Sequence, residues 1–175
     1  MSVRIHTASE AHASLLSELG ARTFVETFAS ENTPENMSRY LAETFTPERQ
    51  REELLDARNR FLIAFSADAA IGYAQLKLGS VEPCVEGLRP VELVRLYVKQ
   101  AWHGRKVGAA LMQQCLEEAL QMGARTIWLG VWGRNERACA FYERWGFVKV
   151  GSHVFQLGDD PQTDLIMQRT IASPV

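Results

Sequence analysis

The stretch WHGRKVGAALM, residues 102–112, follows closely on VELVRLYV, residues 91–98. The run 91–98 is rich in β-branched and large apolar residues, which predicts a buried strand. Two glycines and two cations form a short loop at 104–108, and apolar residues then recur at helical spacing over 111–120. The first N–H groups of a helix lack intrahelical partners and carry positive potential. The order of strand, basic glycine loop and helix therefore predicts a cradle for an anion such as a phosphate group.

The charge of the chain is distributed unevenly around this stretch. The whole sequence has 19 Lys and Arg against 21 Asp and Glu, a net charge of −2. That balance argues against a nucleic-acid binder that works by bulk electrostatics. Residues 89–112, in contrast, hold five basic residues and a single acid, Glu92. A local basic patch in a mildly acidic protein predicts a small anionic ligand.

Length and composition predict one compact domain over residues 1–175, with 46% hydrophobic and 23% charged residues. There is no apolar run of about 18 residues and no apolar signal region at the N-terminus, which predicts a cytoplasmic protein with no membrane segment. The cysteines and three of the histidines show no metal-ligand spacing, so neither a metal site nor a disulfide framework is expected. These residues are Cys84, Cys115, Cys139, His6, His12 and His153. The sequence leaves a monomer and a homodimer open.

Periodicity along the chain predicts an α+β protein with early helices and a mixed sheet of about seven strands. Helices are expected over 9–28, in one or two pieces around Gly20, and over 34–45 and 47–58, where Thr33 and Thr46 precede prolines as caps. A further helix follows the loop at 104–108 and ends before Gly123, and another is capped by Asn135. Strands are expected at 3–8, 61–66, 71–79, 91–98, 125–132, 147–157 and 164–171, with the loop GDDPQT at 158–163 joining the last two.

Two familiar phosphate-binding motifs do not fit the glycine loop. A Walker loop needs Lys and Ser or Thr after its last glycine, whereas Gly108 is followed by Ala109 and Ala110. The dinucleotide pattern GxGxxG is absent as well. On local evidence alone, a purely structural turn before a helix stays open as the alternative.

Three segments in order, VELVRLYV, WHGRKVGAALM and NERACAFYERWGF, resemble the GNAT superfamily of N-acetyltransferases over residues 60–150. The resemblance implies a mixed, mostly antiparallel central sheet flanked by helices, with acetyl-CoA as cofactor. In that family a loop of the form Q/R-x-x-G-x-G/A holds the cofactor's pyrophosphate. Residues 103–108 fill it at the usual spacing, with His103 in place of Gln or Arg and Lys106 in place of the first glycine. A second register, 105–110, fits RxxGxA, but the first matches the strand and helix distances better.

The same resemblance implies which residues contact the cofactor. Backbone groups of the loop would bind the pyrophosphate, the strand backbone would pair with the pantetheine amides, and the helix of AFYERWGF would add further contacts. The loop residues are His103, Gly104, Arg105, Lys106, Val107, Gly108 and Ala109; the strand residues are Leu96, Tyr97 and Val98; and the helix residues are Asn135, Ala138 and Arg144.

Two residues are candidates for proton transfer. Glu92 heads the strand 91–98, a position at which GNAT enzymes often carry a catalytic glutamate, and would be the general base. By strand alternation we expect it to share a face with Val94, Leu96 and Val98. Its alternative is a solvated strand end paired with a neighbouring cation. Tyr142 matches the family's general acid, and its alternative is core packing in an aromatic helix stripe.

The acceptor is predicted to be a small-molecule amine. Residues 26–41 and 154–167 resemble the PaiA-type spermidine/spermine acetyltransferase branch, which implies a polyamine. Acidic residues in and around these segments would suit a polycation, although helix starts and turns explain the same residues: Glu26, Glu31, Glu35, Asp159, Asp160 and Asp164. Two alternatives stay open: a non-catalytic acyl-CoA-binding or regulatory module, and an acetyltransferase for a different amine, such as an antibiotic, an amino acid or a peptide N-terminus.

Overall fold

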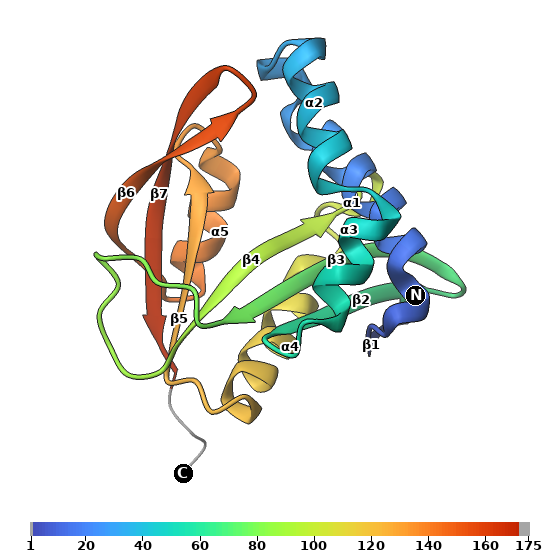
Figure 1. Cartoon of the computed structure of the whole chain (residues 1–175). Helices are drawn as coiled ribbons and strands as arrows, with labels where there is room; N and C mark the ends of the chain where they lie inside the picture. The colour runs from blue at the N-terminus through green and yellow to red at the C-terminus, as the bar shows by residue number, and fades with distance from the viewer. Residues whose placement is uncertain (1, 172–175) are drawn as a thin grey trace.

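The computed structural model describes residues 2–171, which form one seven-stranded sheet with helices on both faces (Figure 1). Its elements in chain order are β1 Val3–Thr7, η1 Glu10–His12, α1 Ala13–Phe28, η2 Ala29–Glu31, α2 Pro34–Thr44, α3 Pro47–Leu55, β2 Asn59–Ser66, β3 Ala69–Leu78, β4 Pro90–Val98, η3 Gln100–Trp102, α4 Val107–Gln121, β5 Thr126–Trp132, α5 Glu136–Arg144, β6 Val148–Leu157 and β7 Asp160–Thr170, where η marks a 3-10 helix.

The strands lie in the order β1-β2-β3-β4-β5-β7-β6. Every neighbouring pair is antiparallel except β4 and β5, which are parallel. This confirms the predicted mixed, mostly antiparallel sheet. The parallel pair is joined through α4, as a parallel pair requires a crossover connection.

The two faces of the sheet are covered by different helices. Helix α4 packs on β1 to β4, and its buried side shares one large core with α5. Helices α1 and α3 cover the opposite face of the sheet, where two smaller apolar clusters form. Helix α2 extends from this second face toward the β6–β7 hairpin (Figure 1). Helices α4 and α5 therefore lie on one side of β4 and β5, and helices α1 and α2 lie on the other side.

The predicted helix caps are confirmed. The Thr33 and Thr46 hydroxyls accept hydrogen bonds from the backbone N–H groups of Asn36 and Arg49, at 3.3 and 3.1 Å. Helix α1, however, runs through Gly20 without a break. A Cβ atom at Gly20 would meet the Phe45 ring, so this glycine serves close packing and does not end a helix.

A β-bulge in β4 corrects the expected face of Glu92. Gln75 of β3 pairs with Arg95, whereas the next residue, Leu76, pairs with Leu93, so Val94 has no partner in the register. The extra residue reverses the alternation. Leu96 and Val98 therefore lie with Val91 and Leu93 in the core under α4. Glu92 belongs to the opposite face, and the prediction that it shares a face with Leu96 and Val98 is wrong.

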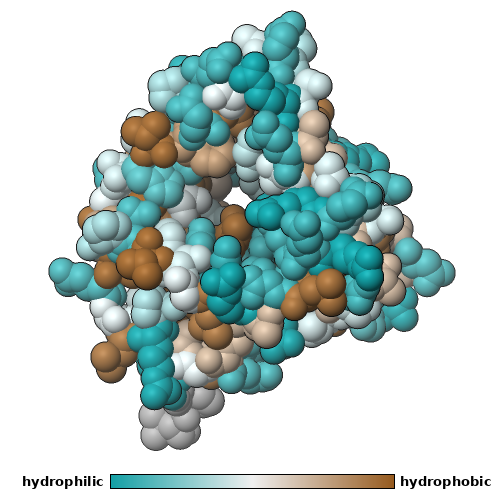
Figure 2. Space-filling view, viewed as in Figure 1, coloured by the Kyte–Doolittle hydropathy of each residue, from teal (hydrophilic) through white to brown (hydrophobic). Residues whose placement is uncertain are grey.

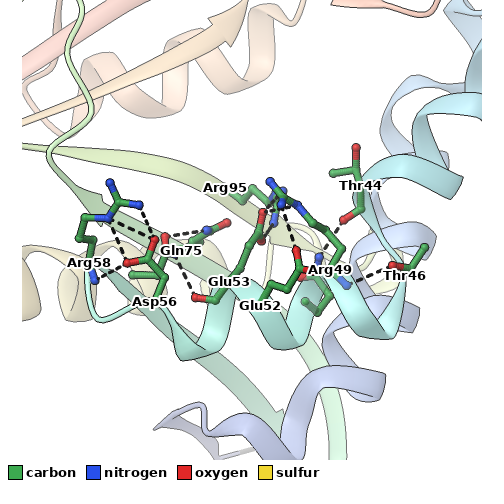
Figure 3. A network of polar contacts seen from close by, with 11 residues as sticks. Thr44, Thr46, Arg49, Glu52, Glu53, Asp56, Arg58, Gln75 and Arg95 are labelled. Atoms are coloured by element: carbon green, nitrogen blue, oxygen red, sulfur yellow. Dashed lines mark hydrogen bonds and ion pairs between the residues drawn. The ribbon is translucent and has the colours of Figure 1, made fainter.

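Just after the bulge, β4 is tied to α3 by a buried ion pair. The Arg95 guanidinium donates to the Glu53 carboxylate at 2.8 Å, and both side chains are about nine-tenths buried, at 10% and 14% exposure. Arg95 also lies over the Phe45 ring. Figure 3 shows Arg95 and Glu53 within a polar network along α3 that includes Arg49 and Thr46. Removing one partner of such a pair leaves an uncompensated buried charge, so the network fixes the path of β4 at the bulge.

The β6–β7 hairpin also differs from its prediction. Leu157 pairs directly with Asp160, so only Gly158 and Asp159 form the turn, and the remainder of GDDPQT belongs to β7. Gly158 has a positive φ of 59°, which glycine adopts without strain. Pro161 lies where β7 extends beyond β5 and has a strand partner on one side only, and a sheet tolerates proline in such a place.

Candidate functional site

The site is built on the separation of the two parallel strands. Strands β4 and β5 share only three residue pairs, of which Glu92 with Trp128 is the last toward their C-terminal ends. Beyond this pair the strands diverge, and a cavity of about 730 Å³ opens between them. In the space-filling view the surface has an opening between the part that carries α2 and the part that carries β6 and β7 (Figure 2). The cavity is lined from both faces of the sheet.

One wall of the cavity is a free strand edge. Leu96, Tyr97 and Val98 pair with β3 on one side, and β5 has already separated from them on the other. All three residues line the cavity. An extended ligand with amide groups can pair with such an edge in the manner of an added strand.

The loop before α4 closes one end of the cavity. Gly104 and Lys106 both have positive φ, 76° and 63°, and Lys106 is the N-cap residue of α4. A residue at position 106 adopts the left-handed conformation, which glycine takes up with less strain than lysine. Helix α4 starts at Val107, so the N–H groups of its first turn lie at the cavity. Residues 103–109 line the cavity with the exception of Arg105, whose guanidinium lies over the Trp102 ring at 5.2 Å from the ring centroid.

His103 has two hydrogen bonds that set its tautomer. Its Nε2–H donates to the Val98 carbonyl at 2.8 Å, and its Nδ1 accepts from the Arg137 guanidinium, also at 2.8 Å. His103 thus connects the end of β4 with α5. Arg137 lines the cavity as well, and the sequence prediction missed this cation. The sequence signal that could have identified Arg137 was its position two residues after the predicted cap Asn135.

Helix α5 provides the wall on the α4 side. The Asn135 side chain accepts from the Ala138 backbone N–H at 3.1 Å, which confirms the cap, and Arg144 lies at the other end of the helix. Tyr142 is 9% exposed, lines the cavity and packs edge-on against Phe141 and Phe147. Burial raises the pKa of the Tyr142 phenol well above its ordinary value, so the hydroxyl carries its proton at neutral pH.

The comparisons with known proteins agree with this geometry. The model of the acetyltransferase (GNAT) family matches residues 22–147 of the chain. An N-acetyltransferase of Mycobacterium tuberculosis is 34% identical over 156 residues, which cover 89% of this chain and 96% of that protein. The chain belongs to the GNAT family. It is an N-acetyltransferase of this family.

Other GNAT proteins are similar over the full length. Spermidine N(1)-acetyltransferase of Thermoplasma acidophilum is 24% identical over 177 residues, 99% of this chain and 100% of that protein. The crystal structure of the PaiA N-acetyltransferase from the same organism, in complex with coenzyme A, superposes with a TM-score of 0.76 at 23% identity and covers 97% of this chain and 99% of that one. The GNAT fold predicted from the sequence is thereby confirmed.

In this GNAT protein, Glu92 of β4, the stretch 103–109 except Arg105, and residues of α5 lie around one cavity, although they come from separate elements. Glu92 is half-buried at the point where β4 and β5 begin to diverge. Tyr142 reaches the cavity from the α4 side of the sheet, and Glu92 belongs to the other face.

The acidic residues that were expected to suit a polycation are separated by the structure. Asp164 alone of the six lines the main cavity. Glu31 and Asp160 line a smaller pocket of about 280 Å³ that shares Trp132 with it. The other three acids lie elsewhere: Glu26 accepts from Arg22 and from the Gln100 backbone, Asp159 pairs with Arg39, and Glu35 is in the exposed first turn of α2.

Sequence reasoning missed an aromatic and polar wall on the α1 and α2 side of the cavity. It consists of Phe24, Phe28, Tyr40, Trp132, His153 and Phe155. His153, which the spacing of histidines had left without a role, hydrogen-bonds Glu82. The two-residue period that places His153 and Phe155 on one face of β6 was the available signal. Burial raises the pKa of the Asp164 carboxyl above its ordinary value.

Among residues 2–171, no helix is long and apolar enough to cross a membrane. Over the same residues, no group of three or more His, Cys, Asp or Glu side chains has the geometry to hold a metal ion. The three cysteines are free thiols, and Cys115 is fully buried on the core-facing side of α4.

Proposed function

We propose that this protein transfers the acetyl group of acetyl-CoA directly to a primary amine of a small molecule, with a polyamine as the first candidate. The observation that carries the proposal is the single cavity at the divergence of β4 and β5. The start of α4 lies at one end, and acidic and aromatic side chains lie on the opposite face of the sheet. This arrangement lets donor and acceptor approach from the two faces and meet between the strands.

Acetyl-CoA is the acetyl donor, and we assign its pyrophosphate to the loop at 103–109. The N–H groups of the first turn of α4 and the positive end of the helix dipole suit this anion. Lys106, Arg137 and Arg144 add positive charge at the cavity. The pantetheine arm would pair with the free edge at Leu96 to Val98, which leads the thioester toward the point where the strands join.

Glu92 is our general base. An alkylamine with a pKa of about 10.4 is neutral in only about one molecule in 2,500 at pH 7, so attack on the thioester requires loss of a proton. The Glu92 carboxylate lies at the closed end of the divergence, where the acetyl group and the amine would meet. A positioned base typically contributes about 10²–10⁴-fold in rate.

Tyr142 is our general acid. The departing thiolate of coenzyme A has a pKa of about 8.5 by analogy with cysteine, so it leaves more easily when protonated. The buried Tyr142 phenol keeps its proton and lines the cavity from the α5 side, where the cofactor would lie. Its packing against Phe141 and Phe147 holds the ring in place and so supports the catalytic role.

Two observations support a polyamine as acceptor. Glu92 and Asp164 are carboxylates that line the cavity together with several aromatic rings, and both groups attract ammonium ions. The spermidine N(1)-acetyltransferase of Thermoplasma acidophilum is similar over the whole chain. The test is a thiol-release assay with acetyl-CoA against spermidine, spermine, amino acids, aminoglycosides and peptide N-termini. We expect the highest kcat/KM for a polyamine, and a higher value for another class would replace the polyamine as acceptor.

A further inference from the structure

A histidine whose two ring nitrogens face two carboxylates stands on the acceptor side of the cavity. The loop between β3 and β4 brings Glu82 against β6, where its Oε2 lies 3.1 Å from His153 Nδ1. A neutral histidine beside a carboxylate places its proton on the nitrogen that faces the oxygen. Nδ1–H then donates to Glu82, and Nε2 is left as an acceptor with a free lone pair.

The free nitrogen of His153 faces a second acceptor. Nε2 lies 3.8 Å from Oδ2 of Asp164, whose side chain is 15% exposed. This distance exceeds that of a hydrogen bond, and in this tautomer neither atom carries a proton for the other. A donor with two N–H or O–H groups can bridge two acceptors that face one another across such a gap.

Gly130 provides the space for that donor. It lies on β5 and lines the cavity, and it is the one exposed residue in its strand. A Cβ atom at Gly130 would lie 3.5 Å from both His153 Nε2 and Asp164 Oδ2. The missing side chain therefore leaves a methyl-sized volume that is equally close to both acceptors.

Aromatic rings continue from this point along the same cavity. Trp132 lies two residues after Gly130, and its ring centroid is 6.0 Å from that of Phe28. Phe155 lies two residues after His153, with its ring centroid 5.7 Å from that of Tyr40. Such rings bind the methylene groups of an alkyl chain and attract the cationic end that precedes it.

We infer that the space above Gly130, between His153 Nε2 and Asp164 Oδ2, binds the ammonium group of an unbranched primary alkylamine. This ammonium seat rests on the proposed function, since it lies on the acceptor side of the same cavity. Two N–H groups of the –NH₃⁺ donate to Nε2 and Oδ2, and the alkyl chain leaves along the aromatic rings. Glu82 is a positioning residue that orients the ring and, in the neutral form of His153, holds the ring proton on Nδ1. A quaternary ammonium has no N–H donor and does not fit this pair of acceptors.

The direct test observes the histidine ring by NMR. The protein has four histidines, and the variant His153→Asn assigns the ring signal of His153. With coenzyme A present, n-butylammonium and spermidine should shift the His153 signal in a saturable manner and leave those of His6 and His12 in place. Butyltrimethylammonium should leave all of these signals unchanged. If n-butylammonium leaves the His153 signal unmoved, or butyltrimethylammonium moves it equally, the ammonium seat is contradicted.

Matched variants distinguish a loss of the ammonium seat from a general loss of folded structure. Gly130→Ala puts a methyl group into the seat, and Asp164→Asn removes one acceptor's charge. Because charge-assisted hydrogen bonds are lost, we expect each to weaken n-butylammonium binding by about ten-fold or more. The controls are Gly133→Ala, whose Cβ would meet Leu165 and the Thr163 backbone at 3.5 Å, and Asp159→Asn, an exposed acid in the same hairpin. Both should bind like the wild type.

The outcomes also separate this inference from the proposed function. If Gly130→Ala binds n-butylammonium as tightly as the wild type does, the ammonium seat is contradicted, whatever the acetyltransferase activity of the enzyme. Binding that requires Gly130 and Asp164, in a protein that never acetylates an amine, supports the seat and contradicts the proposed function. Calorimetry with coenzyme A shows that each variant keeps its cofactor affinity.

Discussion

Glu92 of β4 and Trp128 of β5 form the last residue pair of the two parallel strands before they diverge. This relationship places the acidic side chain at the closed end of the cavity, where an arm laid along the free edge of β4 would finish. The β-bulge at Val94 directs Glu92 to the face opposite α4, toward the acceptor side. The proposed base therefore lies on the face from which, in our proposal, the amine approaches.

The first prediction concerns Glu92. Glu92→Gln keeps the size of the side chain and removes its proton-accepting charge, so kcat should fall by about 10²-fold or more. The affinity for acetyl-CoA, measured by calorimetry, should stay unchanged. Glu43→Gln, at an exposed position near the end of α2, is the control and should keep wild-type kcat. An unchanged kcat in Glu92→Gln would remove Glu92 from the mechanism.

The second prediction concerns Tyr142. Tyr142→Phe retains the ring packing and loses the acidic hydroxyl, so kcat should fall by about 10²-fold while the melting temperature changes little. Since burial raises the pKa of this phenol, the phenol stays protonated as the pH rises, and the rate should show no alkaline loss from Tyr142 below about pH 10. Equal kcat values for the variant and the wild type would leave Tyr142 with a packing role only.

Tyr73→Phe is the matched control. Tyr73 is fully buried on the α1 side of the sheet, it does not line the cavity, and its hydroxyl has no hydrogen-bond partner among the described residues. Its removal should leave kcat unchanged. It should also raise the free energy of unfolding by about 1 kcal/mol, because an unsatisfied buried hydroxyl is costly. A loss of stability in this variant would show that the hydroxyl has a partner.

The third prediction concerns backbone strain at Lys106, whose φ is 63°. Lys106→Gly and Lys106→Ala lose the same charge, but only glycine relieves the left-handed conformation. The glycine variant should therefore exceed the alanine variant in free energy of unfolding by about 1 kcal/mol. Denaturant unfolding of both proteins measures this difference. Equal stabilities would show that the loop does not constrain Lys106.

The fourth prediction concerns Gly108, where a Cβ would meet Phe141 and Leu96 at no closer than 3.8 Å. The protein itself has room for a side chain here, whereas the pyrophosphate that we place at the start of α4 would leave none. Gly108→Glu should therefore fold and lose the rise in melting temperature that we expect acetyl-CoA to cause in the wild type. Gln113→Glu, on the exposed side of α4, adds the same charge and should keep that rise. A full thermal shift in Gly108→Glu would place the phosphates elsewhere.

Local signals in the sequence were sufficient for much of the fold. Thr33, Thr46 and Asn135 cap the predicted helices because a cap depends on residues within one turn. The basic loop before α4 was also predictable, since it combines glycines, cations and a helix start in one segment.

What could not be predicted depends on register and on contacts between distant segments. The bulge at Val94 arises from the pairing of β4 with β3, and it reversed the expected face of Glu92. His153 had no visible role in the sequence because its partners Glu82 and Asp164 come from a loop and a strand far from each other in the chain. The aromatic wall likewise forms only when α1 packs against the end of β5 and α2 packs against β6.

The central claim is most directly tested by amine-dependent release of the coenzyme A thiol from acetyl-CoA. The wild type should release thiol in proportion to an added amine, with spermidine and spermine as the first substrates. Glu92→Gln and Tyr142→Phe should bind acetyl-CoA normally and release thiol at least about 10²-fold more slowly. A wild-type protein that binds acetyl-CoA and releases no thiol with any amine would contradict this account and indicate a non-catalytic binding module.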